Sequence, residues 1–274
     1  MTRVVKIGDI KIGTGKGFAI FAGPCVIETE ELAFSIASHL KSITRKYKIP
    51  YVFKASYDKA NRLSIDSYRG PGLNEGLRII SNIKKELDIP ILLDVHSVEE
   101  IEKVAEVADI IQIPAFLCRQ TDLVVESAKT QKPLHIKKGQ FMAPEDMLYI
   151  AQKAEKYGNA QIILCERGTS FGYHNLVVDF RSIPIMKSLG YPVSYDATHS
   201  LQFPGKNKGA SGGAGKFAFK MAMAGLVMGA DVIFFETHPN PKNAPSDSAV
   251  MMKISKIESL LEKLTAIYKI IERR

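Results

Sequence analysis

The sequence has few cysteines and no long hydrophobic run. Cys25, Cys118 and Cys165 are an odd number of thiols, scattered through 274 residues. They are too few for a disulfide framework, and they indicate a reducing compartment, the cytoplasm. Residues 1–17 lack the apolar stretch of a signal peptide, and no run approaches the roughly 18 apolar residues of a membrane span. These absences exclude a secreted, disulfide-rich or membrane-spanning protein.

The chain has more basic than acidic residues, 37 against 29, which gives a net charge of +8. Such a surplus suits either nucleic acid or small anionic substrates. No basic helix and no alternation of basic and aromatic residues suggests nucleic acid. No linker rich in proline or serine divides the chain, so we expect a single domain over residues 1–274.

Short apolar, β-branched runs alternate with segments of helical periodicity along the whole chain. The runs lie at 18–25, 51–56, 91–96, 110–114, 134–139, 161–167, 193–199 and 232–238. Helix-like segments include 29–47, 72–87, 97–107, 144–157, 215–229 and 248–274. Eight strands that are each followed by a helix predict a closed (β/α)8 barrel, the TIM barrel, rather than an open sheet. Two short β-like segments before the first strand predict an N-terminal β-hairpin.

Side chains that can bind ligands or take part in catalysis stand at the ends of seven of the eight predicted strands. They are Cys25, Lys54, Asp94 with His96, Lys137, Arg167, Asp196 with His199, and Glu236 with His238. The active site of a (β/α)8 barrel lies at the C-terminal ends of its strands. We therefore expect these side chains to line one site.

One subset of the strand-end residues and their loops is cationic. It consists of Lys54, Lys59, Arg62, Lys137 and Arg167. Converging lysines and arginines hold phosphate and carboxylate groups, because arginine offers a planar fork and lysine a point charge. The alternative for any single member is a solvated surface charge.

A second subset combines a thiol, an imidazole and two carboxylates. Cys25, His199, Glu236 and Asp247 lie at or after strands one, seven and eight, which are neighbours in a closed barrel. Such a donor set suits Zn²⁺ or another first-row divalent ion and not an all-oxygen Mg²⁺ or Ca²⁺ site. The sequence has no CxxC or HExxH spacing, so a buried Cys25 without a metal role stays open at this point.

A glycine-rich stretch at 204–216 is similar to a phosphate-binding P-loop but departs from it. Ala210 replaces the first glycine and Phe217 replaces the Ser or Thr that binds Mg²⁺. We expect a mobile loop over the barrel mouth there.

Long motifs closely resemble the 3-deoxy-D-manno-octulosonate 8-phosphate synthase family. They are AGPCVIE (22–28), KASYDKANRLSIDSYRGPGL (54–73), QIPAFLCRQTDL (112–123), IKKGQF (136–141), DATHS (196–200), FFETHPNP (234–241) and APSDS (244–248). The resemblance implies a (β/α)8 enzyme, usually a homotetramer. It condenses phosphoenolpyruvate with arabinose 5-phosphate and water and releases phosphate, toward the sugar of lipopolysaccharide.

The resemblance also implies roles for individual residues. The family has a metal-dependent and a metal-independent branch, and the metal-independent branch has an asparagine at the position of Cys25. The metal ligands of the other branch match Cys25, His199, Glu236 and Asp247, so one divalent ion (Zn, Fe, Mn or Co) is expected. The expected phosphoenolpyruvate site is Lys54, Lys59, Lys137, Gln140 and Arg167. The expected pentose-phosphate loop is Asn61, Arg62 and Ser64, while Phe116 and Arg119 match a segment that reaches a neighbouring subunit's site. Asp94 and His199 are expected near the sugar hydroxyls and aldehyde, and His199, Asp247, Lys137 and Asp94 are the expected catalytic residues.

The loop KANRLS departs from the family, because Leu63 stands where a serine is usual. Losing one hydrogen bond to the sugar phosphate costs about 0.5–1.5 kcal/mol. Two alternatives remain: a sibling enzyme that uses erythrose 4-phosphate, and a non-catalytic sugar-phosphate sensor on the same barrel. The sibling's loop typically reads KPRT, whereas this chain has KANR at 59–62.

Overall fold

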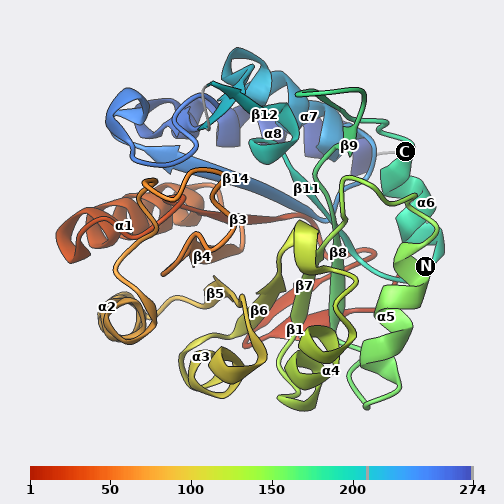
Figure 1. The fold of residues 1–274 in the computed structure, drawn as a ribbon. Coiled ribbons are helices and arrows are strands. Elements are labelled where there is room, and N and C mark those ends of the chain that lie inside the picture. Colours follow the sequence, from red (N-terminus) through yellow and green to blue (C-terminus); the bar gives the residue numbers. More distant parts are fainter. Residues whose placement is uncertain (208–209, 273–274) are drawn as a thin grey trace.

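A computed structural model describes residues 1–207 and 210–272. Residues 208–209 of the expected loop and the basic pair 273–274 of the expected last helix lie outside these ranges. Eight parallel strands form the centre of the molecule (Figure 1). They are β3 (Ala19–Gly23), β4 (Tyr51–Ala55), β5 (Ile91–Asp94), β6 (Ile110–Ile113), β7 (Leu134–Lys137), β8 (Ile162–Glu166), β11 (Val193–Asp196) and β14 (Val232–His238).

The sheet closes on itself. Each of these strands is hydrogen-bonded to the next in chain order, and β14 pairs with both β11 and β3. In this register Asp196 lies opposite Phe234, and Glu236 lies opposite Gly23. The closed (β/α)8 barrel predicted from the alternation of strands and helices is therefore confirmed, and its closure brings the first and last strands together.

Helices surround the barrel (Figure 1). They are α1 (Glu30–Lys46), α2 (Leu73–Leu87), α3 (Ile101–Val107), α4 (Thr121–Lys129), α5 (Met147–Glu155), α6 (Ser182–Ser188), α7 (Ala218–Val227) and α8 (Ile257–Glu272). The start of α1 shows how the sequence defines a helix end. The Thr29 side chain accepts a hydrogen bond from the backbone N–H of Leu32, and two glutamates occupy the first turn. No helix within the described ranges is both long and apolar enough to cross a bilayer.

The last helix begins later than its periodicity predicts. Residues 248–256 were expected to be helical, but Met252–Lys253 form β15, which extends the parallel pairing of β14. The backbone N–H groups of Val250 and Met251 donate to the Asp247 carbonyl instead of continuing a helix. The prediction was wrong here because strand pairing and a turn satisfy the backbone groups of this apolar stretch.

Side chains alternate along each strand between two cores. On β14, Ile233 and Phe235 pack outward against the helices, whereas Val232 and Phe234 pack inside the barrel. The N-terminal hairpin of β1 (Val5–Ile7) and β2 (Ile10–Ile12) adds its apolar side chains to the inner cluster. The predicted hairpin is confirmed.

Two further antiparallel hairpins follow β8 and β11. They are β9 (Thr169–Ser170) with β10 (Leu176–Val177), and β12 (Gln202–Asn207) with β13 (Ala210–Gly213). The second occupies the stretch that was expected to be a loop. Phe203 pairs with Gly212 across it, although the register shifts between Phe203 and Asn207. The segment expected to be a mobile loop over the barrel mouth therefore contains a hairpin, and its residues Pro204, Gly205 and Ser211 line a cavity there.

Candidate active site

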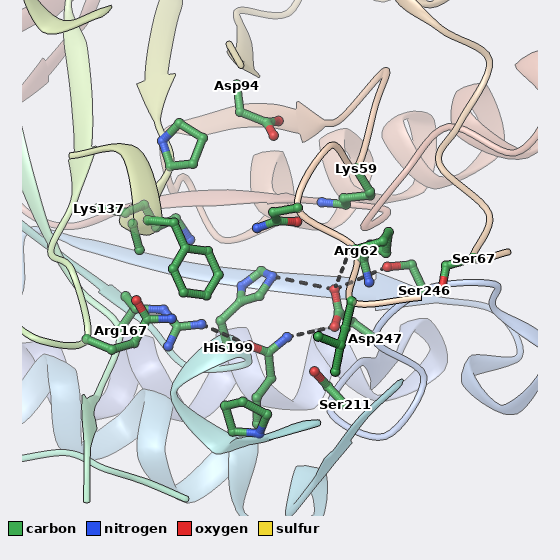
Figure 2. Close-up of a pocket in the computed structure, with 18 of the residues that line it drawn as sticks. Lys59, Arg62, Ser67, Asp94, Lys137, Arg167, His199, Ser211, Ser246 and Asp247 are labelled. Carbon is green, nitrogen blue, oxygen red and sulfur yellow. Dashed lines mark hydrogen bonds and ion pairs between the residues drawn. The ribbon is translucent and has the colours of Figure 1, made fainter. Parts of the chain in front are cut away.

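A cavity of about 420 Å³ lies at the C-terminal ends of the barrel strands (Figure 2). It brings together most of the predicted site residues. Those that line it are Lys54, Lys59, Asn61, Arg62, Asp94, Phe116, Lys137, Gln140, Arg167, His199 and Asp247. Four predicted residues do not line it: Cys25 and Glu236, which are described below, and Ser64 and Arg119. Ser64 accepts a hydrogen bond from the backbone of Asp66 in its own loop, and Arg119 is exposed, with its carbonyl bound by Lys153.

Two lysines converge at one side of the cavity through a shared hydroxyl. The Nζ atoms of Lys54 and Lys59 both lie 2.9 Å from Ser56 Oγ, and this hydroxyl donates to Asp94 Oδ1 at 2.6 Å. Burial alone raises a carboxyl pKa, but Lys54 and Lys59 hold the pKa of Asp94 well below its ordinary value. Burial opposes the charge of Lys59, yet Cys25 and Glu236 raise its pKa. Lys59 therefore stays cationic.

Arginine side chains supply donors on the other sides. Arg167 is buried, and its Nη2 donates to Gln202 Oε1 at 2.8 Å while its Nη1 has no hydrogen-bond partner among the described residues. Arg62 Nε is likewise unpartnered within those ranges. Buried donors without partners cost free energy, so these guanidinium groups are arranged for an anionic ligand.

The basic groups of the cavity form ion pairs with several buried carboxylates. Lys54 Nζ lies 3.3 Å from Glu236 Oε1, Arg62 Nη2 lies 3.6 Å from Asp247 Oδ2, and Lys137 forms an ion pair with Asp196. Cations and carboxylates thus share one network at the cavity floor. Such a network holds the long basic side chains in place before a ligand binds.

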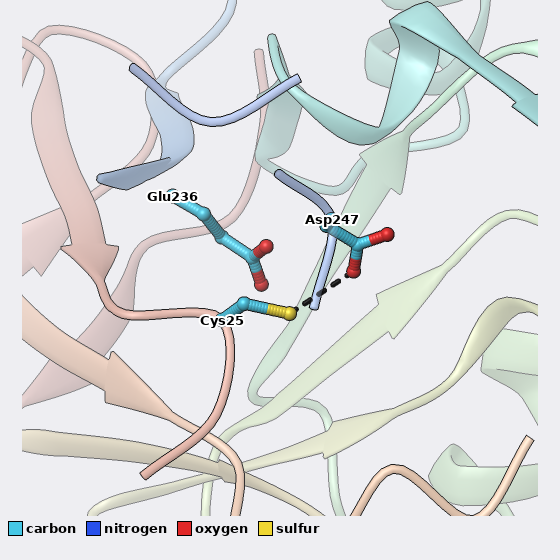
Figure 3. A group of neighbouring side chains, drawn as sticks. All are labelled: Cys25, Glu236 and Asp247. Carbon is cyan, nitrogen blue, oxygen red and sulfur yellow. Dashed lines mark hydrogen bonds between the residues drawn. The ribbon is translucent and has the colours of Figure 1, made fainter. Parts of the chain in front are cut away.

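Cys25, Glu236 and Asp247 form a compact group (Figure 3), and Asp247 also lines the cavity. One ligand atom of each lies within 4.8 Å of the others, and all three residues are buried. Cys25 Sγ is 3.0 Å from Asp247 Oδ2, and Glu236 Oε2 has no hydrogen-bond partner in the described part of the chain. Burial, together with the charges of Asp247 and Glu236, raises the pKa of the Cys25 thiol well above its usual range.

His199 lies beside this group, at the start of the short 3-10 helix His199–Leu201. Its Nε2 is 3.4 Å from Glu236 Oε2 and 3.9 Å from Asp247 Oδ2. Its Nδ1 is 2.7 Å from Asp196 Oδ2, so a carboxylate orients the ring and leaves Nε2 facing the group. A thiol, an imidazole and two carboxylates fit a first-row divalent ion, and the unpartnered Glu236 oxygen is consistent with one.

Asp247 has an unusual backbone conformation, with φ of 51°. Residues other than glycine rarely adopt positive φ, and such strain persists where the surroundings hold it. Here the carboxylate receives a hydrogen bond from Gln202 Nε2 at 2.6 Å, and the carbonyl receives two from the following turn. The strained backbone turns this carboxylate toward Cys25.

Sequence reasoning missed several polar residues of the site. Gln202 joins Arg167 to Asp247, Ser56 joins two lysines, and Ser246 Oγ lies 3.0 Å from Cys25 Sγ. Asp196 was noted as a strand-end residue and as the first residue of the motif DATHS, without a role in the site. Ser56 and Ser246 stand inside the quoted motifs, which is a signal for them. No spacing marks Gln202, because its position depends on how β12 leaves the barrel.

The fold and the site define a class of protein, a (β/α)8 barrel whose mouth is built for small anionic ligands and suited to a divalent ion. The chain belongs to the DAHP synthetase I family, whose sequence model matches residues 2–273.

Three curated relatives carry the name 2-dehydro-3-deoxyphosphooctonate aldolase. The protein of Geotalea uraniireducens is 49% identical over 99% of this chain and 100% of its own length. Those of Geobacter sulfurreducens and Trichlorobacter lovleyi are each 50% identical, over 99% and 97% of this chain and 100% and 98% of their own lengths. These names confirm the resemblance found in the motifs, since they denote 3-deoxy-D-manno-octulosonate 8-phosphate synthase.

Proposed function

We propose that the protein condenses phosphoenolpyruvate with D-arabinose 5-phosphate and water, forming 3-deoxy-D-manno-octulosonate 8-phosphate and phosphate. The observation that carries this proposal is the identity of about half of all residues, over essentially full length, with relatives named for that product. The cavity supports it, because two phosphates and a carboxylate need the several cations that converge there.

The phosphoenolpyruvate site is assigned to Lys54, Lys59, Lys137, Gln140 and Arg167. All five are buried and line the cavity. Because burial strengthens electrostatic interactions, the three lysines and Arg167 neutralise the phosphate and carboxylate of phosphoenolpyruvate, and the five groups together hold the enol carbon toward the aldehyde.

The pentose phosphate is assigned to the loop that contains Asn61, Arg62 and Ser64. Asn61 and Arg62 line the cavity, whereas Ser64 binds its own loop and Ser67 lines the cavity instead. Leu63 lies at the cavity rim with 72% of its surface exposed. Asp94 and His199 are assigned to the sugar hydroxyls and aldehyde, and both face the same cavity.

Cys25, His199, Glu236 and Asp247 would hold one divalent ion, Zn, Fe, Mn or Co. When bound, such an ion acidifies a water molecule or polarises an aldehyde oxygen. Asp196 orients His199 through Nδ1, and Asp247 or Glu236 can accept a proton at a carboxylate oxygen. His199 and Asp247 line the cavity that the substrates would fill, and Cys25 and Glu236 lie close to Asp247.

The test is phosphate release from phosphoenolpyruvate with each of two aldose phosphates. We expect release with arabinose 5-phosphate, little with erythrose 4-phosphate, and loss of turnover when a chelator strips the metal, restored by adding Zn²⁺ or Mn²⁺. Preference for erythrose 4-phosphate would instead identify the sibling enzyme. Binding of a sugar phosphate without any release would identify a sensor.

Replacement of the thiol tests the metal assignment separately. We expect Cys25→Ala to lose most of its bound metal and its metal-supported turnover, because the group loses its only soft ligand. Elemental analysis of the purified protein measures the metal. Cys118→Ala is the matched control, since Cys118 is also a buried free thiol but lies outside the group. Unchanged metal and turnover in Cys25→Ala contradict the assignment.

The assembly is assigned from the resemblance to a homotetramer in the cytoplasm, with one catalytic domain over residues 1–274 in each subunit. Phe116 is 55% exposed and Arg119 is exposed, as expected of side chains that serve a neighbouring subunit. Phe116 also lines the cavity of its own chain, so the segment lies at the boundary between the site and the outer surface.

A further inference from the structure

One aromatic ring lies directly beneath the cations of the cavity. Phe234 stands on the inward face of β14, between Val232 below it and Glu236 above it, and is fully buried. It is the last apolar residue on the inward face of this strand, where Glu236 follows it. Its position makes it the boundary between the barrel's inner core and the cavity floor.

Two lysines of the cavity lie over this ring. Lys137 Nζ is 3.6 Å from the ring centroid, and Lys54 Nζ is 5.8 Å from it. The rings of His135 and His199 are each 5.9 Å from the Phe234 centroid, the first stacked at 11° and the second tilted at 45°. Phe234 thus contacts the basic half of the cavity and the imidazole that would serve the metal group.

An ammonium group inside a barrel loses most of its hydration, which favours its neutral form. A nearby carboxylate stabilises the ammonium group, but its negative charge also reduces the net positive charge of the site. Asp196 has this effect on Lys137. The negative face of an aromatic ring stabilises a cation without carrying a net charge and without occupying an N–H donor. Support of this kind leaves positive charge and free donors for an anionic substrate.

We propose that Phe234 is a positioning residue, whose ring face holds the ammonium groups of Lys137 and Lys54 in place to receive phosphoenolpyruvate. The inference rests on the proposed function and deepens it. It adds an uncharged group to the electrostatics of the site, at a residue to which neither the predicted strand nor the motif FFETHPNP assigned a role.

The neighbouring strand offers a matched comparison. Phe21 on β3 is the direct partner of Phe234 in the register and is equally buried in the same inner cluster. Its ring meets the edge of the His135 ring at 5.6 Å. The two phenylalanines therefore share their level and their inner cluster, but of the two only Phe234 has lysine ammonium groups over its ring.

The experiment replaces Phe234 with mono-, di- and trifluorinated phenylalanine in the full-length, metal-loaded protein. Fluorine keeps the ring's shape and drains the negative charge from its face. We expect phosphoenolpyruvate affinity, measured by calorimetry, and kcat/KM for phosphoenolpyruvate to fall with each fluorine, by about tenfold over the series. The KM for arabinose 5-phosphate stays nearly constant. The same series at Phe21 leaves phosphoenolpyruvate affinity unchanged.

Other outcomes overturn the inference in distinguishable ways. A flat response at Phe234 in an enzyme that turns over normally removes the positioning role and keeps the proposed function. Equal losses at Phe21 and Phe234 show that fluorine disturbs the core as a whole, which also removes the role. If the unmodified protein binds no phosphoenolpyruvate, the proposed function fails and this inference fails with it.

Discussion

His135 is a buried residue of the barrel that makes the stability of the fold depend on pH. Its side chain is fully buried on β7, with Nδ1 3.0 Å from Gln112 Oε1, and its Nε2 has no partner in the described ranges. Burial, together with the charge of Lys137, lowers the pKa of the imidazole well below its ordinary value. The folded protein therefore keeps His135 neutral, while the unfolded chain titrates it near pH 6.5.

This difference predicts a pH dependence of stability. As pH falls below about 6.5, the unfolded chain binds a proton at His135 that the folded protein refuses, so the free energy of unfolding decreases. The limiting slope is about 1.4 kcal/mol per pH unit. We expect His135→Asn, which retains a donor to Gln112, to lose this part of the slope. Denaturant unfolding between pH 7 and pH 5 measures it, and parallel curves for the two proteins contradict the assignment.

At the scale of elements, strand ends were the part of the site that sequence could predict. Inward and outward side chains alternate along a strand, and all eight barrel strands end at one rim. Lys54, Asp94 and Lys137 could therefore be placed at the cavity from their positions in the predicted strands. Closure of the barrel likewise predicted that Cys25 and Glu236 are neighbours, because β3 pairs with β14.

The loops and the late part of the chain were less predictable. The β12–β13 hairpin forms through backbone pairing that leaves no mark in side-chain periodicity, and it carries Gln202 to a position between Arg167 and Asp247. The direction of Ser64 depends on a turn inside its own loop. An apolar stretch before α8 was read as helix because apolar runs suit either structure, and tertiary pairing decided for β15.

At the scale of the whole molecule, one expected contributor to the site does not line the cavity of its own chain. Arg119 is exposed after β6, and the ammonium of Lys153 on α5 binds its carbonyl and the Thr121 hydroxyl at 3.1 and 2.8 Å. The backbone of this segment is thus fixed while its guanidinium side chain faces outward. In a symmetric oligomer such a side chain can complete a site on a neighbouring copy.

Mixed oligomers test whether Arg119 acts across subunits. We expect Arg119→Ala and Lys137→Met each to have strongly reduced turnover, and subunits mixed in equal amounts to regain about a quarter of the wild-type rate. The gain arises at sites whose own chain keeps Lys137 and whose neighbour keeps Arg119.

The control for this gain pairs two residues of one chain. Lys54→Met mixed with Lys137→Met gives no recovery, because Lys54 and Lys137 line the same cavity and every site then lacks one of them. Differently tagged subunits, co-expressed and purified as hybrids, keep the composition known during the phosphate-release assay. Absence of recovery with Arg119→Ala means that Arg119 serves its own subunit or no site at all. Recovery in both mixtures indicates contamination by wild-type chains. A site shared between copies is therefore established only if the mixture with Arg119→Ala recovers turnover and the mixture with Lys54→Met does not.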